Sequence, residues 1–100
     1  MDFNLLIERK RGRFEQVERG VADPQLFDNR KRASDMMREH SSVKQLLARW
    51  TELETARQQL DDNRELAASN DVEMAAMADD EIPDLQKPVP DLERDFPLAP

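Results

Sequence analysis

The most regular hydrophobic pattern in the chain lies between residues 42 and 66. Large apolar residues recur there at steps of three, four and seven, and charged or polar residues fill most positions between them. A period of about 3.6 residues places such positions along one side of a helix and leaves its other sides to solvent. The pattern predicts a long helix whose apolar stripe is covered by other helices. The stripe consists of Val43, Leu46, Leu47, Trp50, Leu53 and Leu60.

Two shorter apolar periodicities precede this stripe and predict two further helices. The first is expected to run from Asp2 to Arg19, with the Asp2 side chain as its N-cap and Gly20 as a left-handed residue at its C-terminal end. Asp23 followed by Pro24 is typical of an N-cap and a first helical residue. A second helix is therefore expected to begin at this dipeptide.

The polar segment at residues 40–42 is expected to break or bend the chain between the second helix and the stripe helix. Ser42, with Gln45 three residues later, forms a capping box, which is a common helix start. His40 would then lie near the C-terminal end of the second helix, where an imidazole can cap carbonyl groups. The stripe helix is expected to end near Ala68.

A fourth helix is expected to begin at Asn70, with Glu73 three residues later as a second start signal. An interior proline removes a hydrogen bond and clashes with the preceding turn, at a cost of about 3 kcal/mol. Because prolines follow residue 82, this helix should end or kink near Pro83. Residues 1–82 are therefore interpreted as a helical domain, and residues 83–100 as the proline-interrupted end of its last helix.

Together these elements predict an all-α fold, an elongated antiparallel bundle or helical hairpin of three to four helices. Only two glycines in 100 residues favour helix, and 22 Leu, Ile, Val and Phe residues allow only a thin core along the helix seams. The side chains expected in these seams are Phe14, Phe27, Val43, Leu47, Trp50, Leu53, Leu60, Met74 and Ile82.

The composition excludes several kinds of site. A chain without cysteine forms neither disulfides nor thiolate metal sites, and His40, the single histidine, does not make a zinc site on its own. The carboxylates at residues 79–84 are interpreted as a solvated acidic face. No phosphate loop, dinucleotide-binding motif or Ser–His–acid set is present. We therefore expect no enzyme activity, no cofactor and, because no long apolar run occurs, a cytoplasmic protein without a membrane partner.

Charge is distributed unevenly along the chain. Residues 1–60 carry 12 Lys and Arg against 10 Asp and Glu, a net of +2, whereas residues 61–100 carry 3 against 12, a net of −9. Basic side chains on a helix attract phosphates without regard to nucleotide sequence. The alternative is a solvated face whose charges pair with nearby carboxylates. The candidate phosphate contacts are Arg9, Lys10, Arg11, Arg13, Arg30, Lys31 and Arg32.

Three segments within residues 26–82 carry a resemblance to a known family. They are RASDMMREHSSV at 32–43, LLARWTEL at 46–53 followed by QQLDD at 58–62, and DVEMAAMADDEI at 71–82. In order and spacing they resemble the N-terminal helical domain of bacterial class I peptide chain release factors. The third segment is similar to the opening of the fourth helix in the factors that read UAA and UAG.

This resemblance implies a role in translation termination. The domain would contact the ribosome at the stalk base, near its L11 protein and neighbouring ribosomal RNA, and would influence the action of the class II release factor. The family's Gly-Gly-Gln hydrolysis motif and codon-reading tripeptide have no matching positions here, so the resemblance assigns no catalytic residue and leaves codon specificity open. On this interpretation the chain is an isolated domain that precedes the core of the factor.

Two alternatives to a release-factor domain remain open from the sequence. The first is a stand-alone coiled-coil adaptor that dimerises through the Val43–Leu60 stripe, and an isolated fragment could also form a homodimer through one exposed end of this seam. The second is a chaperone-like protein that binds RNA generically, which the net charge of −7 disfavours.

Overall fold

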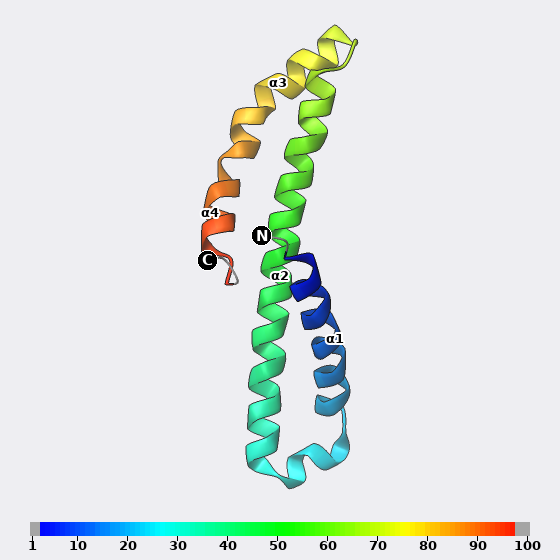
Figure 1. Cartoon of the computed structure of the whole chain (residues 1–100), viewed down its shortest axis with the longest axis vertical. Coiled ribbons are helices and arrows are strands. Elements are labelled where there is room, and N and C mark those ends of the chain that lie inside the picture. The colour runs from blue at the N-terminus through cyan, green and yellow to red at the C-terminus, as the bar shows by residue number, and fades with distance from the viewer. Residues whose placement is uncertain (1–2, 98–100) are drawn as a thin grey trace. The chain divides into compact units, whose positions relative to one another are not determined.

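The computed structural model describes residues 3–97, and these residues form helices joined by short connections (Figure 1). The helices are α1 (Asn4–Val21), the short 3-10 helix η1 (Pro24–Asp28), α2 (Arg30–Ala67), α3 (Val72–Gln86) and α4 (Pro88–Asp95). No strand occurs within the described range. The all-α fold class is therefore confirmed. Asp2, the expected N-cap of the first helix, lies outside the described residues.

The chain divides into two compact units within α2. The N-terminal unit is Met1–Ala48 and the C-terminal unit is Arg49–Pro100. The N-terminal unit thus holds α1, η1 and the first half of α2, and the C-terminal unit holds the second half of α2 with α3 and α4. Each unit contains buried apolar side chains.

In the N-terminal unit, α1 lies beside the first half of α2 (Figure 1). The rings of Phe14 and His40 stack with their centroids 5.0 Å apart. A Cβ atom added to Gly20 would overlap the Met36 sulfur and would lie 2.9 Å from its methyl carbon. The glycine therefore allows a close approach of Met36. It is not a left-handed C-cap as expected, because α1 continues to Val21 and no described residue has a positive φ.

The connection between α1 and α2 differs from the expected helix. The Asp23 side chain does accept a hydrogen bond from the Gln25 amide at 2.9 Å, but only five residues of 3-10 helix follow. Asn29 is then extended, with φ −123° and ψ 104°. Because a 3-10 helix has about 3.0 residues per turn, its phase differs from that of an α-helix. Leu26 is therefore buried, and Phe27, expected in the core, is 63% exposed.

The helix α2 passes through residues 40–42 without interruption, so the expected break and the capping box at Ser42 are wrong. His40 accordingly lies inside a helix and not at its end. A serine in a helix interior costs less than about 0.7 kcal/mol relative to alanine. Burying the side chains of Val43 and Leu46 contributes about 1.5–3 kcal/mol each, which outweighs that cost.

In the C-terminal unit, α3 returns along the second half of α2 (Figure 1). Its N-cap is Asp71, one residue after the expected Asn70, and the Asp71 side chain accepts a hydrogen bond from the Met74 amide at 3.2 Å. Asn63 on α2 donates hydrogen bonds to the Ala78 carbonyl and to the Glu81 carboxylate on α3, at 3.4 and 3.0 Å. These contacts fix the register of the two helices.

The proline-rich segment is largely helical. Helix α3 does not end at Pro83 but continues to Gln86, and α4 starts at Pro88, where a missing amide hydrogen costs little at a first helical position. Beyond α4, the ring of Phe96 packs on Trp50 with centroids 5.3 Å apart, and both residues are buried. Residues 83–96 thus contribute to the core of the C-terminal unit.

The side chains expected in the helix seams are only partly buried. Met74 is 48% exposed, so its assignment to the core is wrong, as it is for Phe27. Met74 lies in the first turn of α3, beside the last turns of α2. Phe14, Leu47 and Ile82 are half-buried. The remaining seam residues, Val43, Trp50, Leu53 and Leu60, are buried.

Candidate functional site

The two basic clusters predicted from the sequence both lie in the N-terminal unit, on different helices. Arg9, Lys10, Arg11 and Arg13 belong to α1, and Arg30, Lys31 and Arg32 form the first turn of α2. Arg13 faces Glu39, eight residues along α2 from Lys31. Because an α-helix rises about 1.5 Å per residue, Glu39 lies roughly 12 Å from Lys31 along the axis of α2. Arg13 of the first cluster nevertheless lines one groove together with Lys31 and Arg32 of the second.

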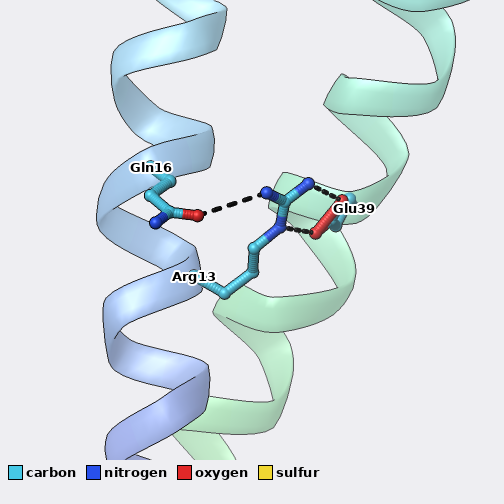
Figure 2. Close-up of polar contacts among 3 residues, drawn as sticks. All are labelled: Arg13, Gln16 and Glu39. Carbon is cyan, nitrogen blue, oxygen red and sulfur yellow. Dashed lines mark hydrogen bonds and ion pairs between the residues drawn. The ribbon is translucent and has the colours of Figure 1, made fainter.

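Arg13 is bound within the protein. Its guanidinium donates two hydrogen bonds to the Glu39 carboxylate, one of them from Nη2 to Oε1 at 2.7 Å, and a third to Gln16 Oε1 at 3.3 Å (Figure 2). These hydrogen bonds lower the pKa of Glu39, burial opposes them, and the charges of Arg13 and Lys10 lower the pKa further. Arg13 therefore joins α1 to α2 and is less available to an external anion.

The other basic residues of α1 differ in their contacts. Arg11 forms an ion pair with Glu8 at 2.9 Å, and both side chains are exposed. Within residues 3–97, the side chains of Arg9 and Lys10 form no hydrogen bond or ion pair. Exposed local pairs such as Arg11–Glu8 contribute little to stability and exchange readily with solvent or a ligand. The α1 cluster thus contains both paired and unpaired cations.

The first turn of α2 presents cations that no described residue pairs. Asn29 Oδ1 accepts a hydrogen bond from the Arg32 amide at 3.1 Å and thereby caps the helix. The side chains of Arg30, Lys31 and Arg32 are exposed and form no ion pair within the described range. The N-terminal end of a helix carries a partial positive charge, so cations there are not stabilised by the helix dipole. Their charge is available to an external anion.

A surface groove of about 310 Å³ brings some of these residues together. Its lining combines three cations and two carboxylates with one amide and one thioether. Within residues 3–97, no cluster of three or more His, Asp or Glu side chains could hold a metal ion. The charged lining of the groove can therefore bind charged groups. Its lining residues are Arg13, Asn29, Lys31, Arg32, Asp35, Met36 and Glu39.

Four residues that line the groove were not among the predicted contacts: Asn29, Asp35, Met36 and Glu39. Asn29 directly precedes the Arg30–Arg32 run, and an asparagine before a helical pattern is a recognised N-cap signal that could have located the start of α2. Glu39 had no such signal, because its partner Arg13 lies 26 residues earlier in the chain. Only the pairing of α1 with α2 brings those two charges together.

Comparison with known proteins assigns the chain to a family. The PCRF domain matches residues 10–99. The chain therefore belongs to the peptide chain release factor family. It is 43% identical over 95 residues to Peptide chain release factor 1 of Akkermansia muciniphila, an alignment that covers 95% of this chain and 26% of that protein.

More distant relatives carry the same family names. The chain is 36% identical to Peptide chain release factor 2 of Thermomicrobium roseum, over 89% of this chain and 24% of that protein. It is 28% identical to Peptide chain release factor 1 of Nitratidesulfovibrio vulgaris strain DP4, over 86% and 24% respectively. The chain thus spans about a quarter of the length of the curated relatives it matches. No solved structure matches it. Among residues 3–97, no helix has the length and apolarity needed to cross a membrane.

Proposed function

We propose that this chain is the helical domain of a release factor that acts in translation termination, and that it binds the ribosome through cations of its N-terminal unit. Its membership of the release factor family carries this proposal. The unpaired side chains of Arg30, Lys31 and Arg32 support it, because exposed cations attract the phosphates of ribosomal RNA. The chain supplies binding and position, and no residue in it is assigned to peptide release.

The proposed contact lies at the base of the ribosomal stalk, near protein L11 and the adjacent RNA, as the family resemblance implies. From there the domain influences how the class II factor acts on the bound factor. The acidic C-terminal unit supports a directional contact, because its net charge of −9 is repelled by RNA while the N-terminal unit, at +2, is attracted. The 43% identity to a relative named Peptide chain release factor 1 supports the type that reads UAA and UAG.

The test is the salt dependence of ribosome binding by a complete release factor that carries this domain. Removing one phosphate contact lowers the slope of log affinity against log salt by about 0.7–0.9. We expect the triple variant R30A/K31A/R32A to bind more weakly at low salt, with the slope reduced by roughly 2. Unchanged binding by this variant across the salt range would contradict the proposed contact.

The chain offers a charge-matched control. Arg64, Lys87 and Arg94 are exposed cations of the C-terminal unit, and each forms an ion pair with a carboxylate three residues before it. The variant R64A/K87A/R94A removes the same formal charge as the triple variant above. It should leave the slope unchanged. An equal weakening in both variants would show a general effect of net charge and no specific contact.

The alternative of a coiled-coil adaptor requires the Val43–Leu60 stripe to be open to a second chain. Val43, Leu46, Trp50, Leu53 and Leu60 are each at most 8% exposed, so the single chain already covers them. We therefore expect sedimentation of the 100-residue chain to give a monomer whose mass is independent of concentration. A concentration-dependent dimer that V43E abolishes would favour the adaptor instead.

A further inference from the structure

The C-terminal unit exposes an apolar groove where the last turns of α2 meet the start of α3. Leu66, Met74 and Met77 line it and are 40%, 48% and 66% exposed. The groove has a volume of about 150 Å³ and is completed by Asn63, Ala78 and Glu81. We call it the methionine groove. Large apolar side chains gathered in one concave site, unlike single ones scattered over a surface, are typical of an interaction site.

The walls of the methionine groove are held in place without a ligand. Asn63 joins α2 to α3 through its hydrogen bonds to the Ala78 carbonyl and the Glu81 carboxylate. Ala78 itself is buried between the walls, and the Asp71 side chain caps the first turn of α3, which carries Met74. The backbone of the groove is therefore preformed, while the two methionine side chains remain adaptable. Methionine adjusts its shape easily, and protein surfaces that accept varied apolar partners use it often.

The surroundings of the groove are strongly acidic. Residues 61–86 contain nine Asp and Glu and a single cation, Arg64, which pairs with Asp61 at 3.9 Å. Glu73, Asp80 and Glu81 stand four residues before and three and four residues after Met77, positions that neighbour it on a helix surface. A partner that fills this groove therefore needs apolar side chains at its centre and cationic side chains around them.

We propose that the methionine groove binds an amphipathic helical segment of a partner protein, with apolar anchor residues flanked by lysine and arginine. Helices dock in apolar grooves through anchors spaced three, four and seven residues apart. The charge argues against other occupants, because nucleic acid phosphates are repelled by the rim and a second copy would place two acidic units against each other. This surface and partner class differ from those of the phosphate contact, and the proposal does not depend on that contact.

The probe is a synthetic 15-residue helical peptide with leucine at an i, i+3, i+7 spacing and lysine at most other positions. It is added to the 100-residue chain labelled at its methionine methyl groups, whose NMR signals report each methionine separately. We expect the Met74 and Met77 signals to shift to saturation, and the shift to weaken as salt is raised. The signal of Met37, an exposed methionine of the N-terminal unit, should stay in place.

A peptide with the same leucines but glutamate in place of lysine should not bind. The variant M77Q should weaken binding of the lysine peptide about tenfold, as expected when an apolar anchor is removed, whereas M37Q should bind normally. Both substitutions change exposed side chains, so the far-UV circular dichroism spectrum should not change. The proposal is overturned if Met74 and Met77 do not respond, if Met37 responds equally, or if the glutamate peptide binds as well.

Self-association is a separate outcome of the same experiment. Shifts of Met74 and Met77 that depend on the concentration of the chain alone, before peptide is added, would assign the groove to a second copy and overturn the proposal. The peptide experiment contains no ribosome, so a negative result does not bear on the proposed phosphate contact. That contact is tested separately by the salt dependence of ribosome binding.

Discussion

The two units of this molecule use charge in different ways. The N-terminal unit carries ten Lys and Arg against eight Asp and Glu, and the C-terminal unit carries five against fourteen. Within residues 3–97, the C-terminal unit pairs most of its few cations with carboxylates: Arg57, Arg64, Lys87 and Arg94. The N-terminal unit leaves many of its cations without such a pair, among them Arg9, Lys10, Arg30, Lys31 and Arg32.

This difference in charge concerns which partners each unit binds, and it does not explain why each unit is stable. Exposed ion pairs contribute only about 0–1 kcal/mol each, so neither pattern explains why a unit folds. Both units instead depend on a few buried apolar side chains. The surplus cations of one unit and the surplus carboxylates of the other select which molecules approach each surface. Substitutions in the core should therefore have larger effects on stability than substitutions of charge.

The largest effect is expected from L53A in the C-terminal unit and I7A in the N-terminal unit. Both side chains are almost fully buried, and a buried large-to-small change costs about 2–5 kcal/mol of unfolding free energy. Denaturant unfolding should be followed by circular dichroism and by fluorescence of Trp50, which belongs to the C-terminal unit. The control L5A changes an exposed leucine and should have little effect.

The same pair of variants tests whether the units are independent. If they unfold separately, I7A lowers the circular dichroism midpoint and leaves the Trp50 midpoint unchanged. If both probes shift together in I7A, the two units unfold as one cooperative structure.

A smaller effect, this time an increase in the free energy of unfolding, is expected from P83A in the C-terminal unit. Alanine restores the amide that an interior proline lacks, and this gain of up to about 3 kcal/mol is partly offset by greater entropy of the unfolded chain. We expect the unfolding free energy to rise by about 1–2 kcal/mol. The control P97A lies outside the helices and should change little. A loss of stability in P83A would show that the packing of α3 requires a bend at this proline.

The helix caps of the two units should contribute similar amounts. Asn29 caps α2 and Asp71 caps α3, each through one backbone amide at 3.1 and 3.2 Å. N29A and D71A should each reduce the unfolding free energy by about 1 kcal/mol. N29D keeps a side-chain acceptor and adds a negative charge at a helix N-terminus, so it should retain the stability that N29A loses. If N29D is as unstable as N29A, the side-chain acceptor does not act as a cap.

The smallest effect concerns the pH dependence of the Arg13–Glu39 pair. Hydrogen bonds from Arg13 hold the pKa of Glu39 below its ordinary value of 4.5. A depressed folded-state pKa stabilises the protein above the unfolded-state value, and this stabilisation is lost as the pH falls through the folded-state pKa. E39Q should therefore be less stable than the parent near neutral pH, and the difference should diminish below about pH 4.5. E15Q is the control, because the Glu15 carboxylate forms no pair within residues 3–97.

Much of the helical class and part of the core could be predicted from the sequence. Periodic apolar residues identify the buried face of a helix even when the helix that covers it is unknown. The pattern therefore predicts the burial of Val43, Trp50, Leu53 and Leu60. The errors arise where a local signal competes with packing. Ser41 and Ser42 resemble a helix boundary, yet the helix continues because Val43 and Leu46 after them are buried.

Other features depend on the direction in which successive side chains point and on partners far away in the sequence. A local sequence pattern contains neither kind of information. The short 3-10 helix changes the direction of successive side chains, so Leu26 turns inward and Phe27 outward. The pairing of Arg13 with Glu39 arises only after α1 and α2 come together. Sequence reasoning therefore located the basic residues of the candidate site but did not separate those paired within the protein from those left unpaired.

The close approach of Met36 to Gly20 has a consequence for oxidative damage. Oxidation of a methionine sulfur adds an oxygen atom and converts an apolar side chain into a polar one. Met36 is half-buried and its sulfur lies in the space that a Cβ of residue 20 would occupy, whereas Met37, its neighbour, is exposed. Peroxide should therefore oxidise Met37 well before Met36. By allowing Met36 to pack this closely, Gly20 thus also limits the access of oxidants to the Met36 sulfur.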